Sequence, residues 1–97
     1  MKKKIYISGQ ISNLKFEDAE WLFDQTEIYL TNIGYDVVNP IRIEHNHDLS
    51  WINYMKTDIK ALMDCDSIYM LKNWTNSNGA EIERRLAKNL GMEIIYE

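Results

Sequence analysis

The sequence has a single cysteine, Cys65, a single proline, Pro40, and four glycines among its 97 residues. One cysteine cannot form an internal disulfide, which is typical of proteins from a reducing compartment. The longest apolar runs are only a few residues, too short to span a membrane, and the Met-Lys-Lys-Lys start lacks the apolar segment of a signal peptide. These absences predict a soluble, cytoplasmic chain with no membrane partner.

Charge and composition narrow the class of protein further. The chain has 11 basic and 15 acidic residues, a net charge of -4, whereas binding along a nucleic acid requires clustered lysine and arginine. A long nucleic acid is therefore not expected as a partner. Hydrophobic residues make up 45% of the chain, enough for one core in a chain of this length. Residues 1–97 are predicted to form one domain.

Short β-branched or aromatic runs alternate along the chain with amphipathic segments. Glycine, asparagine or proline follows most of them, as is typical of element ends. Asn13 is placed to cap the first helix, and Ser50 is placed to cap the second. The predicted strands are residues 4–8, 35–38, 67–71 and 92–96, and the predicted helices are residues 17–33, 51–63 and a third that follows residues 77–79 and ends at Gly91.

This alternation of strand and helix predicts right-handed βαβ units and a mainly parallel sheet of four to five strands. The fold class is α/β, a small doubly wound, Rossmann-like or flavodoxin-like three-layer sandwich. Ligands of such sheets bind outside the carboxyl ends of the strands, where the strand order reverses. The loops predicted at that edge are residues 9–13, 39–49 and 72–78.

The third helix carries an acidic residue on the face that it should bury. Glu83 falls within an apolar stripe, and a buried carboxylate costs several kcal/mol unless it is paired or hydrogen-bonded. Two interpretations remain open: Glu83 caps a backbone amide or pairs with a core tyrosine, or it faces a ligand at the carboxyl edge. The stripe consists of Gly79, Ile82, Leu86, Ala87 and Leu90, and the opposite, solvent side consists of Glu81, Arg84, Arg85 and Lys88.

Two loops of small residues precede helices at the predicted ligand edge. Ser77-Asn78-Gly79 leads into the third helix, and Gly9-Gln10-Ile11-Ser12 follows the first strand. Backbone N–H groups at a helix N-terminus bind anions, although serine and glycine are also ordinary capping residues. Side by side, the two loops would suit a phosphate or a sugar.

Three further residues have two interpretations each. Asp58, at the border of the second helix's apolar stripe, is either a surface residue or a second acid at the site. Tyr6 on the first strand is either a core residue or directs its hydroxyl to the ligand edge. Trp74, which follows Asn73 in the loop over that edge, either stacks on a base or packs on the loop.

Metal and cofactor sites find little support in the sequence. His45 and His47 lie two apart in a loop, without the spacing of known zinc motifs. Cys65 ends a helix before a buried strand and is interpreted as a small core residue rather than a nucleophile. Glycine-rich dinucleotide and phosphate-loop motifs are missing as well. No metal and no cofactor is therefore expected.

Five short motifs follow one another along the chain. They are Ile5-Tyr6-Ile7-Ser8-Gly9, Gly34-Tyr35-Asp36-Val37-Val38-Asn39-Pro40, Trp51 with Tyr54-Met55 and Asp58, Cys65-Asp66-Ser67-Ile68, and Ser77-Asn78-Gly79-Ala80 with Glu83. In this order and spacing they resemble the nucleoside 2-deoxyribosyltransferase superfamily, specifically a short bacterial and phage branch of it. The similarity covers nearly the whole chain, and its specificity lies in the order and spacing of the motifs.

The resemblance implies an enzyme that cleaves or transfers at the N-glycosidic bond of a nucleoside or nucleotide. It implies that Glu83 attacks the anomeric carbon, that Asp58 assists at the sugar hydroxyls and the departing base, and that Tyr6 orients the nucleophile. Two carboxyl groups suit an oxocarbenium-like transition state, as in retaining glycosidases. The residues expected to hold the substrate are Gly9, Gln10, Ser12, Asn73, Trp74, Ser77 and Gly79.

A second class of function remains open, a nucleotide-binding or sensing module that keeps the fold and the pocket without turnover. In either class the predicted ligand is a small nucleoside or nucleotide. Three aromatic residues predicted to be exposed, Trp21, Trp51 and Tyr54, together with the short chain, favour a homo-oligomer.

Overall fold

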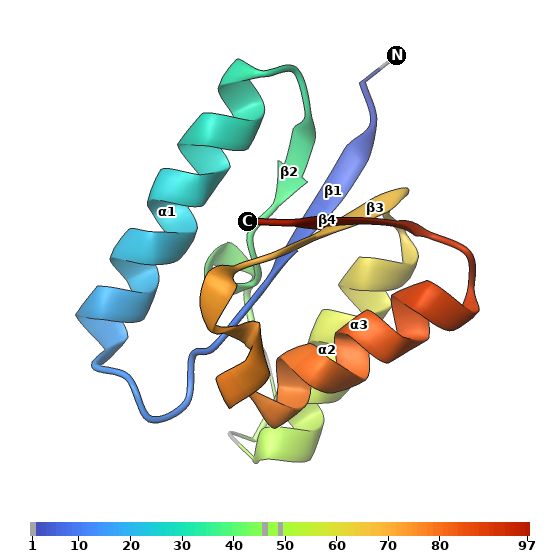
Figure 1. Cartoon of the computed structure of the whole chain (residues 1–97). Helices are drawn as coiled ribbons and strands as arrows, with labels where there is room; N and C mark the ends of the chain where they lie inside the picture. The colour runs from blue at the N-terminus through green and yellow to red at the C-terminus, as the bar shows by residue number, and fades with distance from the viewer. Residues whose placement is uncertain (1, 46, 49) are drawn as a thin grey trace.

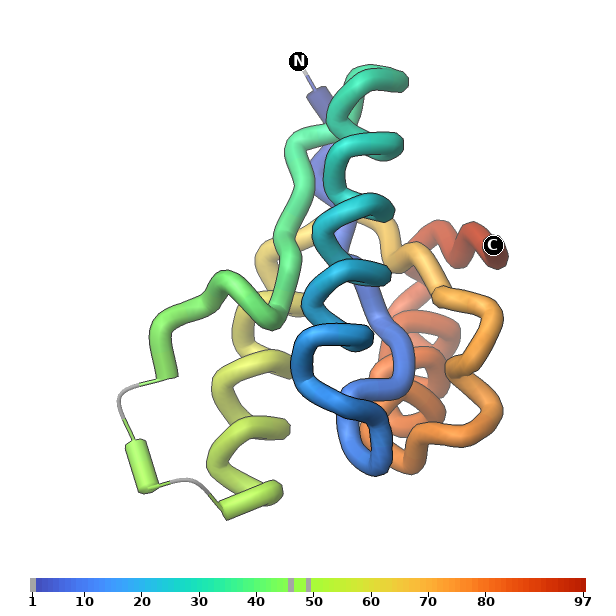
Figure 2. The backbone as a smooth tube through the Cα atoms, turned by 90° about the vertical axis from the view of Figure 1, so that its left-hand side faces the viewer, coloured from blue at the N-terminus to red at the C-terminus, as the bar shows by residue number. Residues whose placement is uncertain are grey.

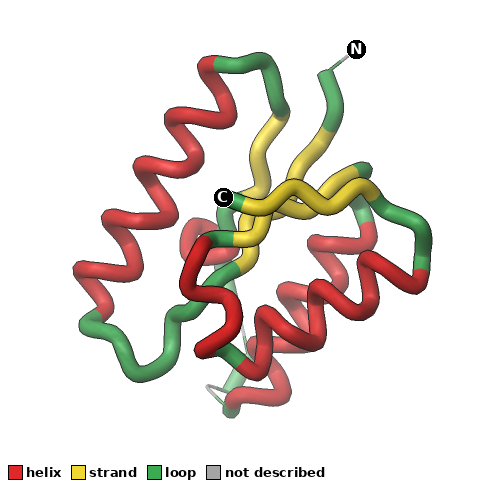
Figure 3. The backbone as a smooth tube through the Cα atoms, viewed as in Figure 1, coloured by secondary structure: helices red, strands yellow, loops and turns green. Residues whose placement is uncertain are grey.

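The computed structural model of the chain describes all residues except 1, 46 and 49 (Figure 1). Strands and helices alternate within the described residues, as predicted. Figure 3 shows the strands gathered in one sheet with the helices outside it. The strands are β1 (Lys4–Ser8), β2 (Asp36–Val38), β3 (Ser67–Met70) and β4 (Glu93–Tyr96), the α-helices are α1 (Phe16–Asn32), α2 (Trp51–Met63) and α3 (Asn78–Asn89), and two 3-10 helices are η1 (Pro40–Arg42) and η2 (Lys72–Asn76).

The four strands form one parallel sheet in the order β2-β1-β3-β4. The chain moves from β1 to one neighbour, β2, and then crosses to β3 on the other side of β1. The strand order therefore reverses between β1 and β3, which is where doubly wound sheets bind ligands. The predicted α/β class and the parallel sheet are confirmed, with four strands in the described residues.

Helices cover both faces of the sheet, with α1 on one face and α2 and α3 on the other (Figure 1). Successive side chains of a strand point to opposite faces, so each strand contributes to two cores. On β1, Ile5 and Ile7 pack with Phe23 and Leu30 of α1, whereas Tyr6 packs with the core under α2 and α3. Burial on both faces explains the continuous apolar run of β3.

The start of α1 differs from the prediction. Asn13 does not cap the helix: the N-cap residue is Lys15, which makes no side-chain capping bond. Asn13 instead takes a positive φ of 70° in the preceding turn, a conformation that asparagine tolerates better than most residues. The turn therefore uses the backbone tolerance of asparagine rather than its side-chain oxygen.

The buried stripes of the helices are narrower than their periodicity predicts. Several apolar residues expected to be buried lie at the stripe borders and are exposed. The sheet has only four short strands, so each helix covers it with one or two residues per turn and leaves the borders open to solvent. The exposed residues are Tyr29 and Ile33 of the first helical segment, Ile52 and Met63 of α2, and Ile82 and Leu90 at α3.

Two acidic residues occupy positions in these stripes. The buried residues of α3 are Ala80, Glu83 and Ala87, and those of α2 are Met55, Asp58 and Leu62. The prediction that Glu83 lies on the buried face is confirmed, and Asp58 is buried rather than on the surface. Both helices therefore place a carboxyl group toward the sheet.

The predicted loops contain short 3-10 helices. η1 lies near the start of the predicted loop 39–49, and η2 occupies most of the predicted loop 72–78. η1 is tied to α1 because Asn39 donates to the carboxylates of Asp24 and Glu27, and Arg42 pairs with Asp24. These bonds fix Pro40, the first residue of η1, beside the end of β1.

The connections that follow β1, β2 and β3 gather at the end of the molecule away from the N-terminus (Figure 2). This end holds the carboxyl ends of the parallel strands, as the sequence predicts. Among the described residues, none of the helices combines the length and apolar character needed to cross a membrane.

Candidate functional site

A cavity of about 200 Å³ opens at the carboxyl end of β1. We call it the carboxyl-edge cavity. Its walls come from the end of β1 and the following loop, from η1, and from the first turns of α2 and α3. The lining residues are Tyr6, Ile7, Ser8, Gly9, Ile11, Ser12, Phe23, Pro40, Trp51, Tyr54, Met55, Asp58, Ser77, Gly79, Ala80 and Glu83.

The Glu83 carboxylate lies in the wall of this cavity, only 5% exposed. Tyr6 Oη donates to Glu83 Oε2 at 2.8 Å, and Ser8 Oγ donates to Glu83 Oε1 at 2.7 Å. Tyr6 and Ser8 are two residues apart on β1, so both side chains point to the face that α3 covers. The pairing of Glu83 with a core tyrosine is confirmed, and the same carboxylate also faces the cavity.

Burial raises the pKa of Glu83 from its ordinary value of 4.5 to about 7. The hydrogen bonds from Ser8 and Tyr6 favour the ionised form, whereas the negative charge of Asp58 disfavours it. The pKa of the Tyr6 hydroxyl lies well above its usual value, first because it is buried and then because of the charge of Glu83. Tyr6 is therefore a donor, and Glu83 is the group that titrates near neutral pH.

Asp58 brings a second acid to the cavity from α2. His45 Nε2 lies 2.9 Å from Asp58 Oδ1, and both side chains are largely buried. Burial raises the pKa of Asp58, and the hydrogen bond from His45 partly offsets this effect. Asp58 thus has a partner, His45, with which it can share a proton.

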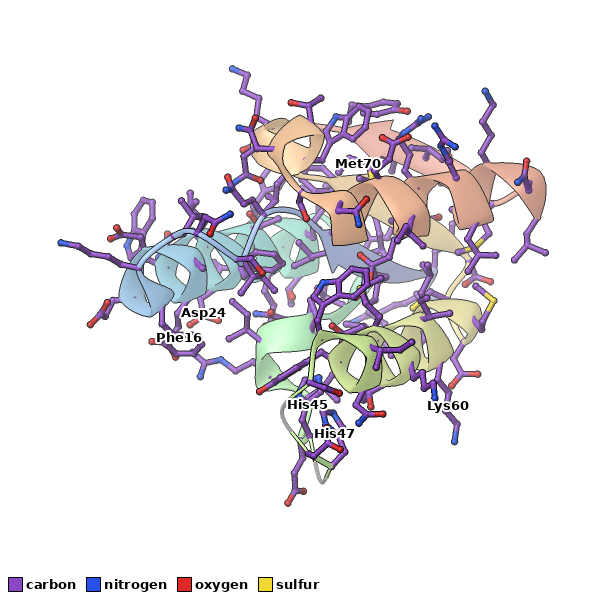
Figure 4. The ribbon with its side chains drawn as sticks, turned by 90° about the horizontal axis from the view of Figure 1, so that it is seen from below. Phe16, Asp24, His45, His47, Lys60 and Met70 are labelled. Carbon is purple, nitrogen blue, oxygen red and sulfur yellow. The ribbon has the colours of Figure 1, made fainter. Side chains whose placement is uncertain are left out.

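The sequence raised His45 only as a candidate metal ligand, and its pair with Asp58 was not predicted. His45 precedes α2 by several residues, and no spacing rule links a loop histidine to a helix residue 13 positions later. The rings of His45, His47 and Tyr54 pack on one another, with centroids 4.7 to 5.2 Å apart. In Figure 4, His45 and His47 lie beside α2. This packing holds the His45 ring against the helix that carries Asp58.

The start of α2 is also fixed by hydrogen bonds. Ser50 Oγ accepts from the backbone N–H of Asn53, which confirms the predicted cap. Asp48 Oδ1 accepts from the backbone of Ser50 and from the side chain of Asn53. The first turn of α2, which contains the cavity residue Trp51, is therefore held in place from the preceding loop.

The aromatic wall of the cavity comes from α2. Trp51 and Tyr54 both line it, and Trp51 is 49% exposed, which places it at the opening. The sequence assigned these two residues to an oligomer surface and assigned the aromatic contact to Trp74. Trp74 does not line the cavity: the Arg84 guanidinium lies 4.8 Å from its ring centroid, and the Tyr96 ring lies beside it.

Four of the predicted substrate-binding residues line the cavity, namely Gly9, Ser12, Ser77 and Gly79. Gln10 and Asn73 do not. The Asn73 side-chain oxygen accepts the backbone N–H of Gln10 at 2.9 Å and so joins the loop after β1 to η2. These two residues therefore hold the loop after β1, which forms part of the cavity wall, without lining the cavity themselves.

The two cavity glycines allow close packing. A Cβ atom at Gly9 would lie 2.6 and 2.8 Å from atoms of the Leu71 side chain, and a Cβ at Gly79 would lie 3.0 Å from Met55 Sδ. The Ser77 hydroxyl accepts the backbone N–H of Ala80 and caps α3. Glycine at these positions therefore brings β1 and α3 close to their neighbours around the cavity.

Metal binding and thiol chemistry find no support in the described residues. They contain no group of three or more histidine, cysteine, aspartate or glutamate side chains placed to hold a metal ion. Burial raises the pKa of the Cys65 thiol to about 11, so the thiol stays protonated near neutral pH. What the cavity offers chemically is two carboxyl groups, three serine hydroxyls and an aromatic wall.

Residues 3–96 match the sequence profile of a family described as Domain of unknown function (DUF4406). The match spans nearly the whole chain, so the chain belongs to this family. No curated protein matches the chain.

The raised pKa of Glu83 predicts a pH-dependent stability. The folded protein keeps this proton to about pH 7, whereas the unfolded chain releases it near 4.5, so the free energy of unfolding falls as pH rises through this window. The full difference is on the order of 3 kcal/mol. We expect Glu83→Gln to remove most of this slope and to raise stability at about pH 8, measured by urea unfolding between about pH 5 and pH 8.

Glu81→Gln is the matched control on the same helix. Arg84 and Arg85 lower the pKa of Glu81, so its titration falls below the tested range and the slope should persist in this variant. An unchanged slope in Glu83→Gln would show that the carboxyl group is not the titrating group.

Proposed function

We propose that this DUF4406 protein cleaves or transfers at the N-glycosidic bond of a nucleoside or nucleotide, with Glu83 as the nucleophile. The observation that carries the proposal is a buried carboxylate in a cavity wall, held through both oxygens by Tyr6 and Ser8 and placed close to a second acid, Asp58. The motif order that resembles the nucleoside 2-deoxyribosyltransferase superfamily predicts the same roles, and that resemblance stays a prediction.

The environment of Glu83 suits a nucleophile. Two short hydrogen bonds fix the plane of the carboxylate, and a fixed reacting group avoids an entropic cost during reaction. No group that lowers the pKa of Glu83 carries a positive charge; the lowering comes only from the two hydroxyls. The carboxylate is thus poorly neutralised in the resting site, and an oxocarbenium-like sugar would supply the missing positive charge.

The proposed reaction has two balanced steps. In the first, a Glu83 oxygen forms a bond to the anomeric carbon while the bond from that carbon to the base nitrogen breaks, and the electron pair leaves with the base. Asp58, or water held by it, supplies a proton to the departing base. In the second, water or another base attacks the same carbon, the ester bond to Glu83 breaks, and the attacking group loses its proton to Asp58.

The size of the cavity indicates which part of the substrate it holds. Sites for whole drug-sized ligands have roughly 300–1,000 Å³, more than the 200 Å³ present. The sugar fits between Glu83, Asp58 and the serine loops, and the base extends to the opening, where Trp51 lines the wall. An exposed indole at an opening gives a planar base a surface on which to stack.

A binding or sensing module without turnover is the second candidate. It is favoured by the Glu83 pKa of about 7, since a protonated carboxyl group is a poor nucleophile. The two candidates share the ligand and differ in whether base is released.

We also propose that the protein resides in a reducing, cytoplasmic compartment. The supporting observation is that Cys65 is buried and unpaired. Cell fractionation tests this proposal directly.

The first test is base release. The purified protein is incubated with deoxynucleosides, their 5′-monophosphates, ribonucleotides and NAD, with and without a second free base, and the products are separated by chromatography. We expect release or exchange of base from at least one of these substrates, and we expect Glu83→Gln to reduce kcat/KM by roughly 10³-fold or more because it removes the nucleophile. Glu81→Gln on the same helix should retain activity.

Ligand-induced stabilisation separates the two candidates. A rise in melting temperature with a nucleoside, without any base release, would favour the binding module over the enzyme. Base release by the Glu83→Gln variant at the wild-type rate would show that Glu83 is not the nucleophile.

His45 is predicted to act through Asp58. Removing the hydrogen bond by His45→Ala leaves the desolvated Asp58 carboxyl with a higher pKa, so the limb of the pH–rate profile that reports Asp58 should move to higher pH. The expected fall in kcat/KM is smaller than the roughly 10²- to 10⁴-fold contribution of a general acid–base group, because Asp58 itself remains. The matched control is His47→Ala, which removes a neighbouring ring but no direct bond to Asp58. If His45→Ala loses activity while its pH–rate profile stays unshifted, His45 has only a structural role.

We also propose that the protein is a homo-oligomer. Trp21 is 62% exposed, and exposed apolar side chains also occur on α2 and α3. Tyr54, by contrast, is half-buried against His45 and His47 and does not contribute to such a surface. Sedimentation equilibrium at micromolar concentration should give a dimer or a larger species, and a monomer would contradict this. The exposed residues are Trp51, Ile52 and Met63 on α2, Ile82 on α3, and Leu90 directly after α3.

A further inference from the structure

The charged groups of the carboxyl-edge cavity are all of one sign. Among the described residues that line it, Asp58 and Glu83 are the only charged ones, and both are buried. All 11 lysine and arginine residues belong to the part of the chain that the structure describes, and none of them lines the cavity. A ligand in this cavity therefore meets two acids and no cationic side chain.

The three arginines have other partners. Arg42 pairs with Asp24 and Glu20 beside α1. Arg84 and Arg85 both donate to Glu81 on the outer side of α3, and Arg84 also lies over Trp74. Each guanidinium is thus held by an acid outside the cavity, so bringing one to a ligand would break an existing pair.

The start of α3 gives only a modest attraction for an anion. A helix N-terminus carries about half a positive charge, and one of its first N–H groups, that of Ala80, is already bonded to Ser77 Oγ. A phosphate group there would carry about two negative charges close to the carboxyl groups of Asp58 and Glu83. Repulsion between the phosphate and these two carboxyl groups therefore opposes the attraction of the helix N-terminus.

The hydrogen-bonding groups of the cavity also favour a hydroxyl group over a phosphate. Ionised carboxylates only accept hydrogen bonds, and phosphate oxygens of a dianion also only accept. A sugar hydroxyl, in contrast, can donate to a carboxylate and accept from a serine hydroxyl such as that of Ser12, which also lines the cavity. A hydroxyl group therefore has partners here that a phosphate lacks.

From these observations we propose that the cavity takes a neutral nucleoside with a free 5′-hydroxyl group and discriminates against the 5′-monophosphate of the same nucleoside. The proposal rests on the proposed function for the identity of the ligand as a nucleoside. Beyond that function, it states that the 5′ position of the sugar carries a hydroxyl group and not a phosphate. The reason is that the cavity is lined by two acids and by no lysine or arginine. The 5′-hydroxyl lies near the serine loops, and the base lies at the opening beside Trp51.

Binding to the wild-type protein tests the proposal without relying on turnover. The probes are a 2′-deoxy C-nucleoside and its 5′-monophosphate, in which a carbon–carbon bond joins base and sugar and no N-glycosidic bond can break. Isothermal titration at about pH 8 and low ionic strength keeps the phosphate dianionic and the electrostatic effect unscreened. We expect the neutral C-nucleoside to bind at least about tenfold more tightly than its monophosphate.

A charge placed in the loop after β1 gives a second, independent readout. Ser12→Lys adds a cation to the cavity wall, and Ser12→Met adds a neutral side chain of similar length. The lysine variant should bring the two affinities at least about fivefold closer, whereas the methionine variant should leave their ratio unchanged. Equal changes in both variants would show that shape rather than charge sets the ratio and would overturn the proposal.

The outcomes separate this proposal from the proposed function. Monophosphate binding as tight as, or tighter than, nucleoside binding overturns the discrimination, even if the wild-type enzyme releases base from nucleotides. Nucleoside-selective binding without base release from any N-nucleoside supports the discrimination and contradicts the enzymatic function. Binding of neither probe contradicts both.

Discussion

The site depends on one buried carboxylate, that of Glu83, and on the two hydroxyl groups that hold it. Tyr6 and Ser8 extend from the same face of β1, and α3 lies over that face with Glu83 directed at them. A carboxylate in this position lowers stability when it is ionised, since burial raises its pKa and no cation offsets the effect. Our proposal of a reactive Glu83 accounts for this cost, because active sites retain reactive groups at the expense of stability.

The rest of the cavity is built around that carboxylate. The reversal of strand order between β1 and β3 leaves the carboxyl end of β1 uncovered, and Gly9 and Gly79 let β1 and α3 approach Leu71 and Met55 closely around it. The hydrogen bond between Asn73 and the backbone of Gln10 joins the loop after β1, part of the cavity wall, to η2. The helix α2 then adds an acid and an aromatic wall. The two carboxyl groups and Tyr6 therefore lie on regular elements, whose positions are fixed by packing.

The sequence predicts the architecture well and the site in part. The alternation of strand and helix is enough for the parallel sheet, and the misplaced charge of Glu83 is enough to locate the cavity. The partners of that charge are harder to predict. Ser8 is a small polar residue at a strand end and has no distinctive signal, although its spacing of two from Tyr6 puts both on one face. His45 lies in a loop, where no periodicity constrains its direction.

The width of the buried stripes could not be predicted from the sequence. Periodicity predicts which face of a helix is apolar, but the width of the buried stripe depends on how much of the sheet lies beneath it, and Ile52, Ile82 and Leu90 are exposed for that reason. Trp74 had two interpretations, stacking on a base or packing on its loop, and its contacts with the Arg84 guanidinium and the Tyr96 ring favour packing. Trp51, one turn before Met55 on α2, occupies the opening instead.

The most direct test of the central claim is to detect the bond between sugar and carboxylate. The wild-type protein is mixed with a substrate that releases base, quenched with acid during turnover and digested, and its peptides are weighed by mass spectrometry. A mass increase equal to the sugar residue, confined to the peptide that contains Glu83, is the result expected for a glutamate nucleophile. Base release with inverted configuration at the anomeric carbon and no modified peptide would contradict it, because water would then attack directly.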